Sequence, residues 1–328
     1  MVDDSAGRPR SSQVPRPPHP HERRQPLPGH RPKPHEDDAF APKAVETILA
    51  SASYREADLD TDFLQQDVTR GVRLQIDYLK TETLLEQHDV AHTIVVFGST
   101  RIPEPQAAGR EVEACAKALA ASPQDSALQR RLAIAERIQA KSRYYDIARE
   151  FGRIVGAAGA KALGGRIMIM TGGGPGIMEA ANRGACDVGA KSIGLNISLP
   201  REQYPNPYVT PELCFRFHYF AIRKLHFLLR ARALVAFPGG YGTIDELFEV
   251  LSLAQTRKIK PVPVILVGEE YWRRVFNPEF LVDEGVIDSE DRDLFWYAES
   301  AESIFRDVVY WHQANGEPLF RPGDAVID

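Results

Sequence analysis

Two glycine-rich turns, each between an apolar run and a helical pattern, carry the residues best suited to chemistry. In the longer motif, the segment Pro238-Gly-Gly-Tyr-Gly-Thr-Ile-Asp-Glu246 follows the apolar run 234–237, which predicts a buried parallel strand. Glycines let the main chain approach a ligand closely, and free N–H groups at the start of a helix attract anions. We therefore expect a phosphate group here, bound by the backbone N–H groups of Gly239, Gly240, Gly242 and Thr243.

A glutamate follows this turn at close range. Glu246 would lie near a bound phosphate ester, where a site that only holds phosphate gains nothing from negative charge. Its presence therefore suggests chemistry beside the phosphate. The spacing Thr243-x-x-Glu246 fits a capping box equally well, with Thr243 opening the helix and Glu246 accepting from its backbone N–H. The spacing alone leaves both interpretations open.

The second glycine-rich turn and one further turn have the composition of ligand-binding loops. An apolar run at 166–170 precedes Thr171-Gly-Gly-Gly-Pro-Gly176 and then a helical pattern, and a strand at 93–97 precedes Gly98-Ser-Thr-Arg101. Neither turn is G-x-G-x-x-G, which disfavours a dinucleotide oxidoreductase. Either turn could also be a tight connection without a ligand. The candidate binding residues are Gly98, Ser99, Gly172, Gly173, Gly174 and, on the early turns of the next helix, Glu179.

A basic pair lies on a predicted helix over residues 220–232. Arg223 borders one apolar face of this helix, and Ile222, Leu225 and Leu229 form a second one. A helix that is apolar on two sides is mostly buried, so Arg223 needs an anion or a carboxylate beside it. That partner could be a carboxylate of the protein, in a structural ion pair, or an anionic substrate. The neighbouring Lys224 could bind the same kind of partner.

Composition and hydropathy exclude several classes of protein. A net charge of −5 and a pI near 6.0 do not indicate nucleic-acid binding, and no apolar run is long enough to span a bilayer. No apolar segment of a secretory signal follows the N-terminus. The three cysteines lack metal-ligand spacing, and we interpret them as small buried hydrophobic residues in a reducing cytoplasm. We therefore expect a cytoplasmic protein without a metal.

Strands alternate with helices along most of the chain, which predicts an α/β fold with a Rossmann-like, doubly wound parallel sheet and additional N-terminal helices. Residues 1–42 are rich in Pro, Arg and His and are expected to be disordered. Residues 43–90 are assigned to N-terminal helices, and 91–328 to the sheet domain. The expected strands are 93–97, 166–170, 192–197, 213–217, 234–237 and 262–267.

Helical periodicity predicts a short helix over 44–52 and two long ones, over 61–86 and 128–155. The first long helix has an apolar stripe, which we expect to pack on the sheet or on a partner subunit. The stripe consists of Phe63, Val68, Val72, Ile76 and Leu79.

These motifs resemble those of the LONELY GUY family, the cytokinin riboside 5′-monophosphate phosphoribohydrolases, formerly labelled lysine decarboxylases. Segment 238–246 is similar to the family's P-G-G-x-G-T-x-x-E signature, segment 171–179 to its other glycine loop, and Arg223-Lys224 to its R-K pair. The resemblance runs from about residue 93 to the C-terminus. The helices before it and the segment at about 122–150 depart from the minimal family pattern.

The resemblance implies a nucleotide-binding catalytic domain that hydrolyses the N-glycosidic bond of a nucleoside 5′-monophosphate, such as AMP or a cytokinin riboside monophosphate. Free base and ribose 5-phosphate would be the products. Arg223 and Glu246 would be the catalytic pair, the glycine loops and Lys224 would bind substrate, and no cofactor would be needed. Family members are usually dimers or larger homo-oligomers.

Two other functions use the same motifs. A nucleotide-binding protein or a carrier of the molybdenum cofactor would also need the glycine turns, although binding phosphate does not require Glu246. The lysine decarboxylase label would require a pyridoxal phosphate Schiff base, for which Lys224 is the only lysine in the motifs.

Overall fold

The computed structural model describes residues 28–29, 31–164, 166–199 and 204–321. Most of the tail predicted to be disordered lies outside these residues. The chain divides into two compact units, residues 1–70 and 71–328, so most of the last N-terminal helix belongs with the sheet. No helix among the described residues is long and apolar enough to cross a membrane.

The described part of the first unit consists of short helices with almost no core, since only Thr69 is buried. The expected helix near 44–52 is present, slightly earlier in the chain. The continuous helix expected over 61–86 is wrong, because the chain breaks after Leu64 and the Thr69 hydroxyl lies 2.8 Å from the carbonyl oxygens of Leu64 and Gln66. The elements are α1 (Ala41–Leu49), η2 (Ala52–Tyr54), α2 (Thr61–Leu64) and η3 (Asp67–Thr69).

The second unit is built on a seven-stranded, entirely parallel sheet in the order β4-β3-β2-β1-β5-β6-β7. The sheet extends on both sides of the central strand β1, which confirms the predicted doubly wound α/β fold. The strands are β1 (Val90–Phe97), β2 (Arg166–Thr171), β3 (Ser192–Ile197), β4 (Cys214–Phe217), β5 (Ala231–Ala236), β6 (Val264–Val267) and β7 (Trp296–Ala298).

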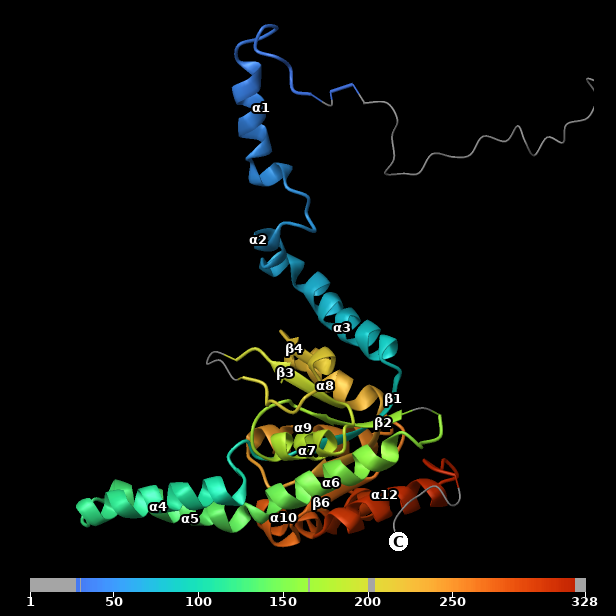
Figure 1. The fold of residues 1–328 in the computed structure, drawn as a ribbon. Coiled ribbons are helices and arrows are strands. Elements are labelled where there is room, and N and C mark those ends of the chain that lie inside the picture. Colours follow the sequence, from blue (N-terminus) through green and yellow to red (C-terminus); the bar gives the residue numbers. More distant parts are fainter. Residues whose placement is uncertain (1–27, 30, 165, 200–203, 322–328) are drawn as a thin grey trace, which may run out of the picture. The chain divides into compact units, whose positions relative to one another are not determined.

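Helices cover both faces of the sheet (Figure 1). One core lies between the sheet and α6 (Arg143–Gly159), α7 (Ile177–Asp187) and α12 (Ala301–Ala314). The other core lies on the opposite face. Its helices are α3 (Arg70–Gln87), α8 (Phe220–Leu229), α9 (Tyr241–Gln255) and α10 (Glu269–Val275). The remaining elements are η4 (Pro211–Leu213), α11 (Pro278–Asp283) and η5 (Ser289–Leu294).

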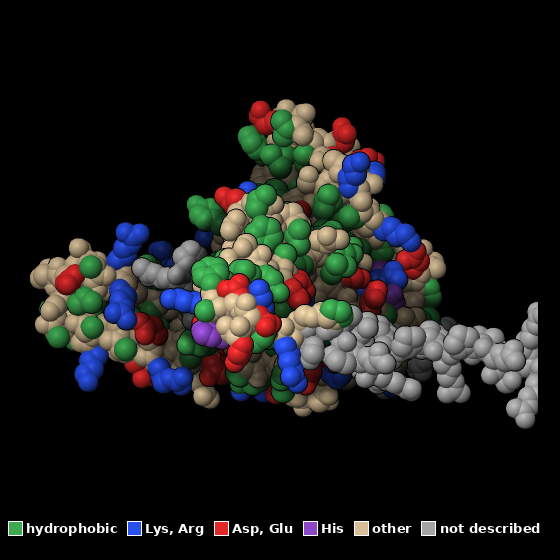
Figure 2. Space-filling view, turned by 90° about the horizontal axis from the view of Figure 1, so that it is seen from above, with side chains coloured by type: hydrophobic (Ala, Val, Ile, Leu, Met, Phe, Trp, Pro, Cys, Tyr) green, Lys and Arg blue, Asp and Glu red, His purple; other side chains and the backbone are tan. Residues whose placement is uncertain are grey.

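The single helix expected over 128–155 is two helices. Here α4 (Pro105–Ala121) and α5 (Ser126–Lys141) lie side by side as a hairpin (Figure 1), and α5 ends at Ser142, where α6 begins. The buried Ser142 hydroxyl donates to the carbonyl of Gln139 at 2.7 Å. Such a local bond competes with continuation of the helix. The hairpin forms the lobe at the left of Figure 2, where several Lys and Arg side chains reach the surface.

Helix α3 packs through residues outside the predicted stripe. It buries Thr81 and Leu85, whereas Val72, Ile76 and Leu79 are exposed. This part of the stripe therefore does not pack on the sheet as expected, and its packing on a partner subunit, the other alternative, stays a prediction. Polar contacts fix the helix instead, including a bidentate ion pair between Glu82 and Arg230 at 2.6 and 2.8 Å. Arg230 also ends α8, which stops at Leu229 and not at residue 232 as predicted.

Candidate active site

The three predicted ligand loops meet at one edge of the sheet. Strand β1 lies between β2 and β5, so the loops that follow these parallel strands open at the same, carboxyl edge. They surround a cavity of about 500 Å³, which is within the usual size range of small-molecule sites. The predicted residues that line it are Gly98, Ser99, Gly172, Gly174, Arg223, Gly240, Gly242, Thr243 and Glu246.

Glu246 is buried and faces this cavity. It is 7% exposed, and burial raises its pKa to about 7, against the opposing effect of the positive charges of Arg223 and Lys224. Helix α9 begins at Tyr241 after an N-cap at Gly240, which has no side-chain cap. Thr243 is therefore the third helical residue and not the cap. Among the described residues, no donor forms a hydrogen bond to the Glu246 carboxylate, so the capping-box interpretation is wrong.

Arg223 enters the same cavity from α8. Its Nε donates to the carbonyl of Leu195 at the end of β3, at 2.7 Å, and its guanidinium lies 5.2 Å from the ring centre of Phe227 and 5.9 Å from that of Phe220. Burial lowers the pKa of Arg223, while the charge of Glu246 opposes that shift. The side chain remains a cation at neutral pH. Within the described residues it forms no ion pair closer than 4 Å with Glu246, so both charges remain available to a ligand.

The loop after β2 is shaped around this arginine. A Cβ atom added to Gly172 would lie 2.5 Å from Nη2 of Arg223 and 2.8 Å from the sulfur of Met178. Gly173 has a positive φ of 68°, and a Cβ there would lie 2.0 Å from Oδ1 of Asn196. These two positions therefore require glycine because protein side chains lie close to them. Gly173 lies outside the residues that line the cavity, and the predicted approach of this loop to a ligand stays a prediction.

A buried network of amides and hydroxyls holds this loop. The Gly173 N–H donates to the Thr171 hydroxyl at 2.9 Å, and that hydroxyl donates to Asn182 at 2.7 Å. Asn206, on the loop after β3, donates from its side chain to the carbonyl of Gly174 and to Asn182, both at 3.0 Å. Its own N–H donates to the carbonyl of Gly173 at 2.8 Å. Asn206 thus connects two loops of the site.

Two parts of the cavity wall have hydrogen-bond donors that could bind an anion. A side chain at Gly240 or Gly242 would meet nothing within 4 Å, so the main chain at the start of α9 is open to a ligand. Opposite, the Ser99 hydroxyl oxygen accepts from the Arg101 N–H at 3.1 Å, which leaves its proton free to donate. Backbone N–H groups, a hydroxyl and the dipole of α9 together can bind a phosphate group.

Other predicted residues lie outside the cavity lining. The Glu179 carboxylate accepts from the Tyr145 hydroxyl at 2.9 Å, and Lys224 pairs with Asp245 at 2.9 Å and Glu249 at 3.3 Å. A Cβ at Gly239 would lie 2.1 Å from the Thr243 hydroxyl. Glu179 and Lys224 therefore bind other residues of the protein. Glycine is required at position 239 because the Thr243 side chain packs against it.

Sequence reasoning missed several lining residues. Arg101 lies two residues after Ser99 in the turn that follows β1, and Asn196 lies near the carboxyl end of β3, so the rule that ligands bind at strand ends could have identified both. Phe220, Met178 and Tyr241 also line the cavity, and Tyr241 is 93% exposed. No cluster of His, Cys, Asp or Glu within the described ranges could hold a metal ion.

Part of this chain is similar in sequence to known proteins. Residues 178–308 match a family model described as "Possible lysine decarboxylase". A probable cytokinin riboside 5′-monophosphate phosphoribohydrolase of Oryza sativa subsp. japonica is 31% identical over 43% of this chain and 62% of its own length. A second one from the same plant, named LOG, is 30% identical over 50% of this chain and 65% of its own length. The chain thus spans somewhat less than two thirds of these relatives.

Solved structures with a similar arrangement include two proteins of another description. A molybdenum cofactor binding protein from Rippkaea orientalis is 18% identical, with a TM-score of 0.39 over 66% of this chain and 94% of the other. A molybdenum cofactor carrier protein from Chlamydomonas reinhardtii is 20% identical, with a TM-score of 0.40 over 68% of this chain and 98% of the other. The family match and the curated relatives, each over half of this chain or less, confirm the resemblance to the phosphoribohydrolases of the LONELY GUY family that the motifs predicted.

Proposed function

We propose that this protein hydrolyses the N-glycosidic bond of a purine nucleoside 5′-monophosphate, releasing the free base and ribose 5-phosphate. The observation that carries the proposal is Glu246, a buried carboxyl group with a pKa raised to about 7 and, within the described part of the chain, no hydrogen bond to the main chain. A group that titrates near the working pH is suited to proton transfer. The relation to phosphoribohydrolases supports the same reaction class.

Binding of the phosphate would fix the sugar. The main chain at Gly240, Gly242 and Thr243 would bind the phosphate from one side, and Ser99 and Arg101 would bind it from the other. This arrangement would hold the anomeric carbon in the cavity near Glu246. Binding energy from the phosphate would then lower the barrier at the glycosidic bond, because the reacting atoms need no further search for alignment.

Cleavage of an N-glycosidic bond builds positive charge on the anomeric carbon, as in glycoside hydrolysis. The Glu246 carboxylate would stabilise that charge and accept a proton from the attacking water. The bond from the anomeric carbon to the base nitrogen would break with its electron pair leaving on the base, and the base would then take up the proton that Glu246 accepted from the water. Arg223 would orient Glu246 and the substrate, because its guanidinium is held by the Leu195 carbonyl and two aromatic rings.

The arrangement around Lys224 argues against a Schiff-base enzyme. Burial alone would lower the pKa of Lys224, but its hydrogen bond to Asp245 and the charge of Glu249 outweigh this effect and raise it. A Schiff-base lysine needs a neutral amine as nucleophile, which a raised pKa disfavours. Lys224 also lies outside the residues that line the cavity.

The direct test is to incubate the purified protein with AMP, GMP, CMP and a cytokinin riboside monophosphate and to separate the products by chromatography. The proposal predicts equal amounts of free base and ribose 5-phosphate from at least one purine nucleotide. Tight binding of a nucleotide without release of base, under conditions in which the protein is folded, would instead identify a nucleotide carrier.

A further inference from the structure

A second and larger cavity lies at the opposite edge of the sheet. Its volume is about 640 Å³, and it includes Ala91 and Ala231 at the amino ends of β1 and β5 and Val262 just before β6. The proposed active site lies at the carboxyl ends of β1 and β5. A strand of six residues spans roughly 17 to 20 Å, so the two cavities are separate.

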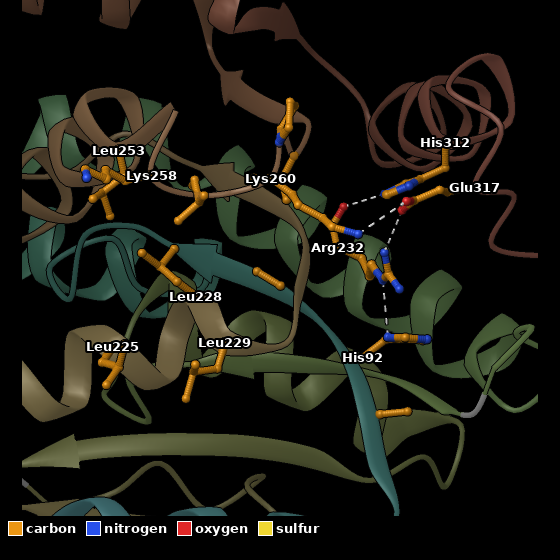
Figure 3. Close-up of a pocket in the computed structure, with 15 residues that line it drawn as sticks. His92, Leu225, Leu228, Leu229, Arg232, Leu253, Lys258, Lys260, His312 and Glu317 are labelled. Atoms are coloured by element: carbon orange, nitrogen blue, oxygen red, sulfur yellow. Dashed lines mark hydrogen bonds and ion pairs between the residues drawn. The ribbon is translucent and has the colours of Figure 1, made fainter. Parts of the chain in front are cut away.

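One wall of this second cavity is apolar. Leu225, Leu228 and Leu229 of α8 contribute to it, together with Leu253 of α9 (Figure 3). Leu225 is 42% exposed and Leu229 is 46% exposed, although both belong to a helix that packs into the core through Ile222 and Phe227. Exposed leucines beside a cavity offer a surface from which an apolar ligand group could displace water.

The other wall is polar and held in a fixed arrangement. The Nε atom of Arg232 donates to Nδ1 of His92 at 3.2 Å, and its Nη1 donates to Glu317 at 3.1 Å. The backbone carbonyl of Arg232 accepts from Nε2 of the buried His312 at 2.6 Å. Figure 3 shows these residues grouped on one side, with the leucines on the other. The guanidinium is therefore oriented before any ligand arrives.

The charges around the cavity are predominantly positive. Arg232, Lys258 and Lys260 supply three cations, and Glu317 is the carboxylate among the lining residues. Glu317 also pairs with Lys260 at 3.7 Å. Burial lowers the pKa of both histidines, helped at His92 by the charge of Arg232, so the imidazoles do not alter this balance at neutral pH. A ligand with one negative charge would offset part of this excess of positive charge.

We propose that this cavity is a second binding site, for a small amphipathic acid with an apolar body and one anionic group. The body would lie against the three leucines of α8, and the anionic group would face Lys258, Lys260 and Arg232. A nucleotide fits less well, because the described residues that line this cavity include neither a glycine-rich turn nor a Phe, Tyr or Trp ring on which a base could stack. The ligand is thus chemically distinct from the proposed substrate.

The test is a fluorescence titration of the full chain with anilinonaphthalene sulfonate, an aromatic probe with a single sulfonate group. Lys258→Glu reverses an exposed charge at the cavity, and Lys117→Glu makes the same change on α4 as a matched control. We expect Lys258→Glu to weaken binding by about fivefold, the most that one exposed charge pair usually contributes. Lys117→Glu should bind the probe as the unmodified protein does.

A second variant and a competition experiment complete the test. Leu229→Trp should also weaken binding, because the larger side chain of this half-exposed residue occupies part of the cavity, and circular dichroism checks that each variant is folded. AMP should not displace the probe. Unchanged binding in both Lys258→Glu and Leu229→Trp would overturn the proposal, and so would displacement of the probe by AMP. This readout does not depend on nucleotide hydrolysis.

Discussion

Replacing Glu246 by glutamine should stabilise the protein at neutral and alkaline pH. Burial raises the pKa of this carboxyl group from 4.5 to about 7, so the folded state holds its proton more tightly than the unfolded state does. Stability from this group is complete below about pH 4.5 and is lost as the pH rises towards 7. At about 1.4 kcal/mol per pH unit, the difference corresponds to about 3 kcal/mol at pH 8.

Glutamine keeps the shape of the protonated side chain and does not ionise. The free energy of unfolding of Glu246→Gln should therefore exceed that of the unmodified protein by about 3 kcal/mol at pH 8 and by less than about 1 kcal/mol at pH 5. Urea unfolding followed by tryptophan fluorescence measures this, because Trp272, Trp296 and Trp311 all lie in the sheet unit.

The matched control is Glu249→Gln, three residues along the same helix. Glu249 pairs with Lys224 at 3.3 Å, so its replacement removes an attraction and should not stabilise the protein at any pH. Equal stability of Glu246→Gln and the unmodified protein at pH 8, or a difference that does not change with pH, would refute the claim that burial raises the pKa of Glu246.

Four further outcomes are expected. The value of kcat/KM should rise with pH through about 7, because the proposed reaction needs the Glu246 carboxylate; a flat profile between pH 5 and 8 would contradict this. Arg223→Met should lower turnover by about 100-fold or more. It should also move the rise of kcat/KM to higher pH, because the Arg223 charge lowers the pKa of Glu246. A pH profile of the residual activity that does not move would argue against this effect of Arg223 on Glu246. Gly172→Ala should reduce activity by displacing Arg223, with a stability cost of about 1 to 3 kcal/mol, while Gly71→Ala, where a Cβ meets nothing, should leave activity unchanged. Asn206→Ala should cost about 1 to 3 kcal/mol and raise KM more than it lowers kcat, because it removes the side-chain hydrogen bonds to the Gly174 carbonyl and to Asn182; an equal loss in both constants would assign it another role.

Local signals in the sequence predicted the sheet and its ligand loops well. The apolar runs before each glycine turn are β2 and β5, and the run at 93–97 is most of β1. The order of the strands in a doubly wound sheet then brings their loops together. For this reason Ser99 and Glu246, which are distant in the sequence, could be assigned to one cavity from the sequence, whereas Arg223 was assigned to it through the family resemblance.

Side-chain direction was harder to predict. Glu179 is on an early turn after a glycine loop, as Glu246 is, but it points to Tyr145 on α6. Lys224 follows Arg223 directly, and consecutive helical residues point about 100° apart, so the two do not share a cavity. Glycines 240 and 242 allowed α9 to begin before Thr243, which the capping signal did not anticipate.

Contacts between segments far apart in the chain were not predictable from local patterns. Asn206 fixes the loop after β2 from a loop 32 residues away from Gly174, and no periodicity marks such a pair. The breaks at Leu64 and Ser142 likewise depend on single hydroxyl groups that bond to nearby carbonyls. In both cases one local hydrogen bond outweighed a helical pattern that continued on either side.

The most direct test of the proposed chemistry compares binding and turnover in Glu246→Gln. AMP affinity is measured by isothermal titration calorimetry, and release of adenine is measured by chromatography on the same preparation. We predict that the variant binds AMP about as tightly as the unmodified protein but releases adenine at least about 100-fold more slowly. Release of adenine at the unmodified rate would contradict the assignment of Glu246 as the catalytic acid–base group.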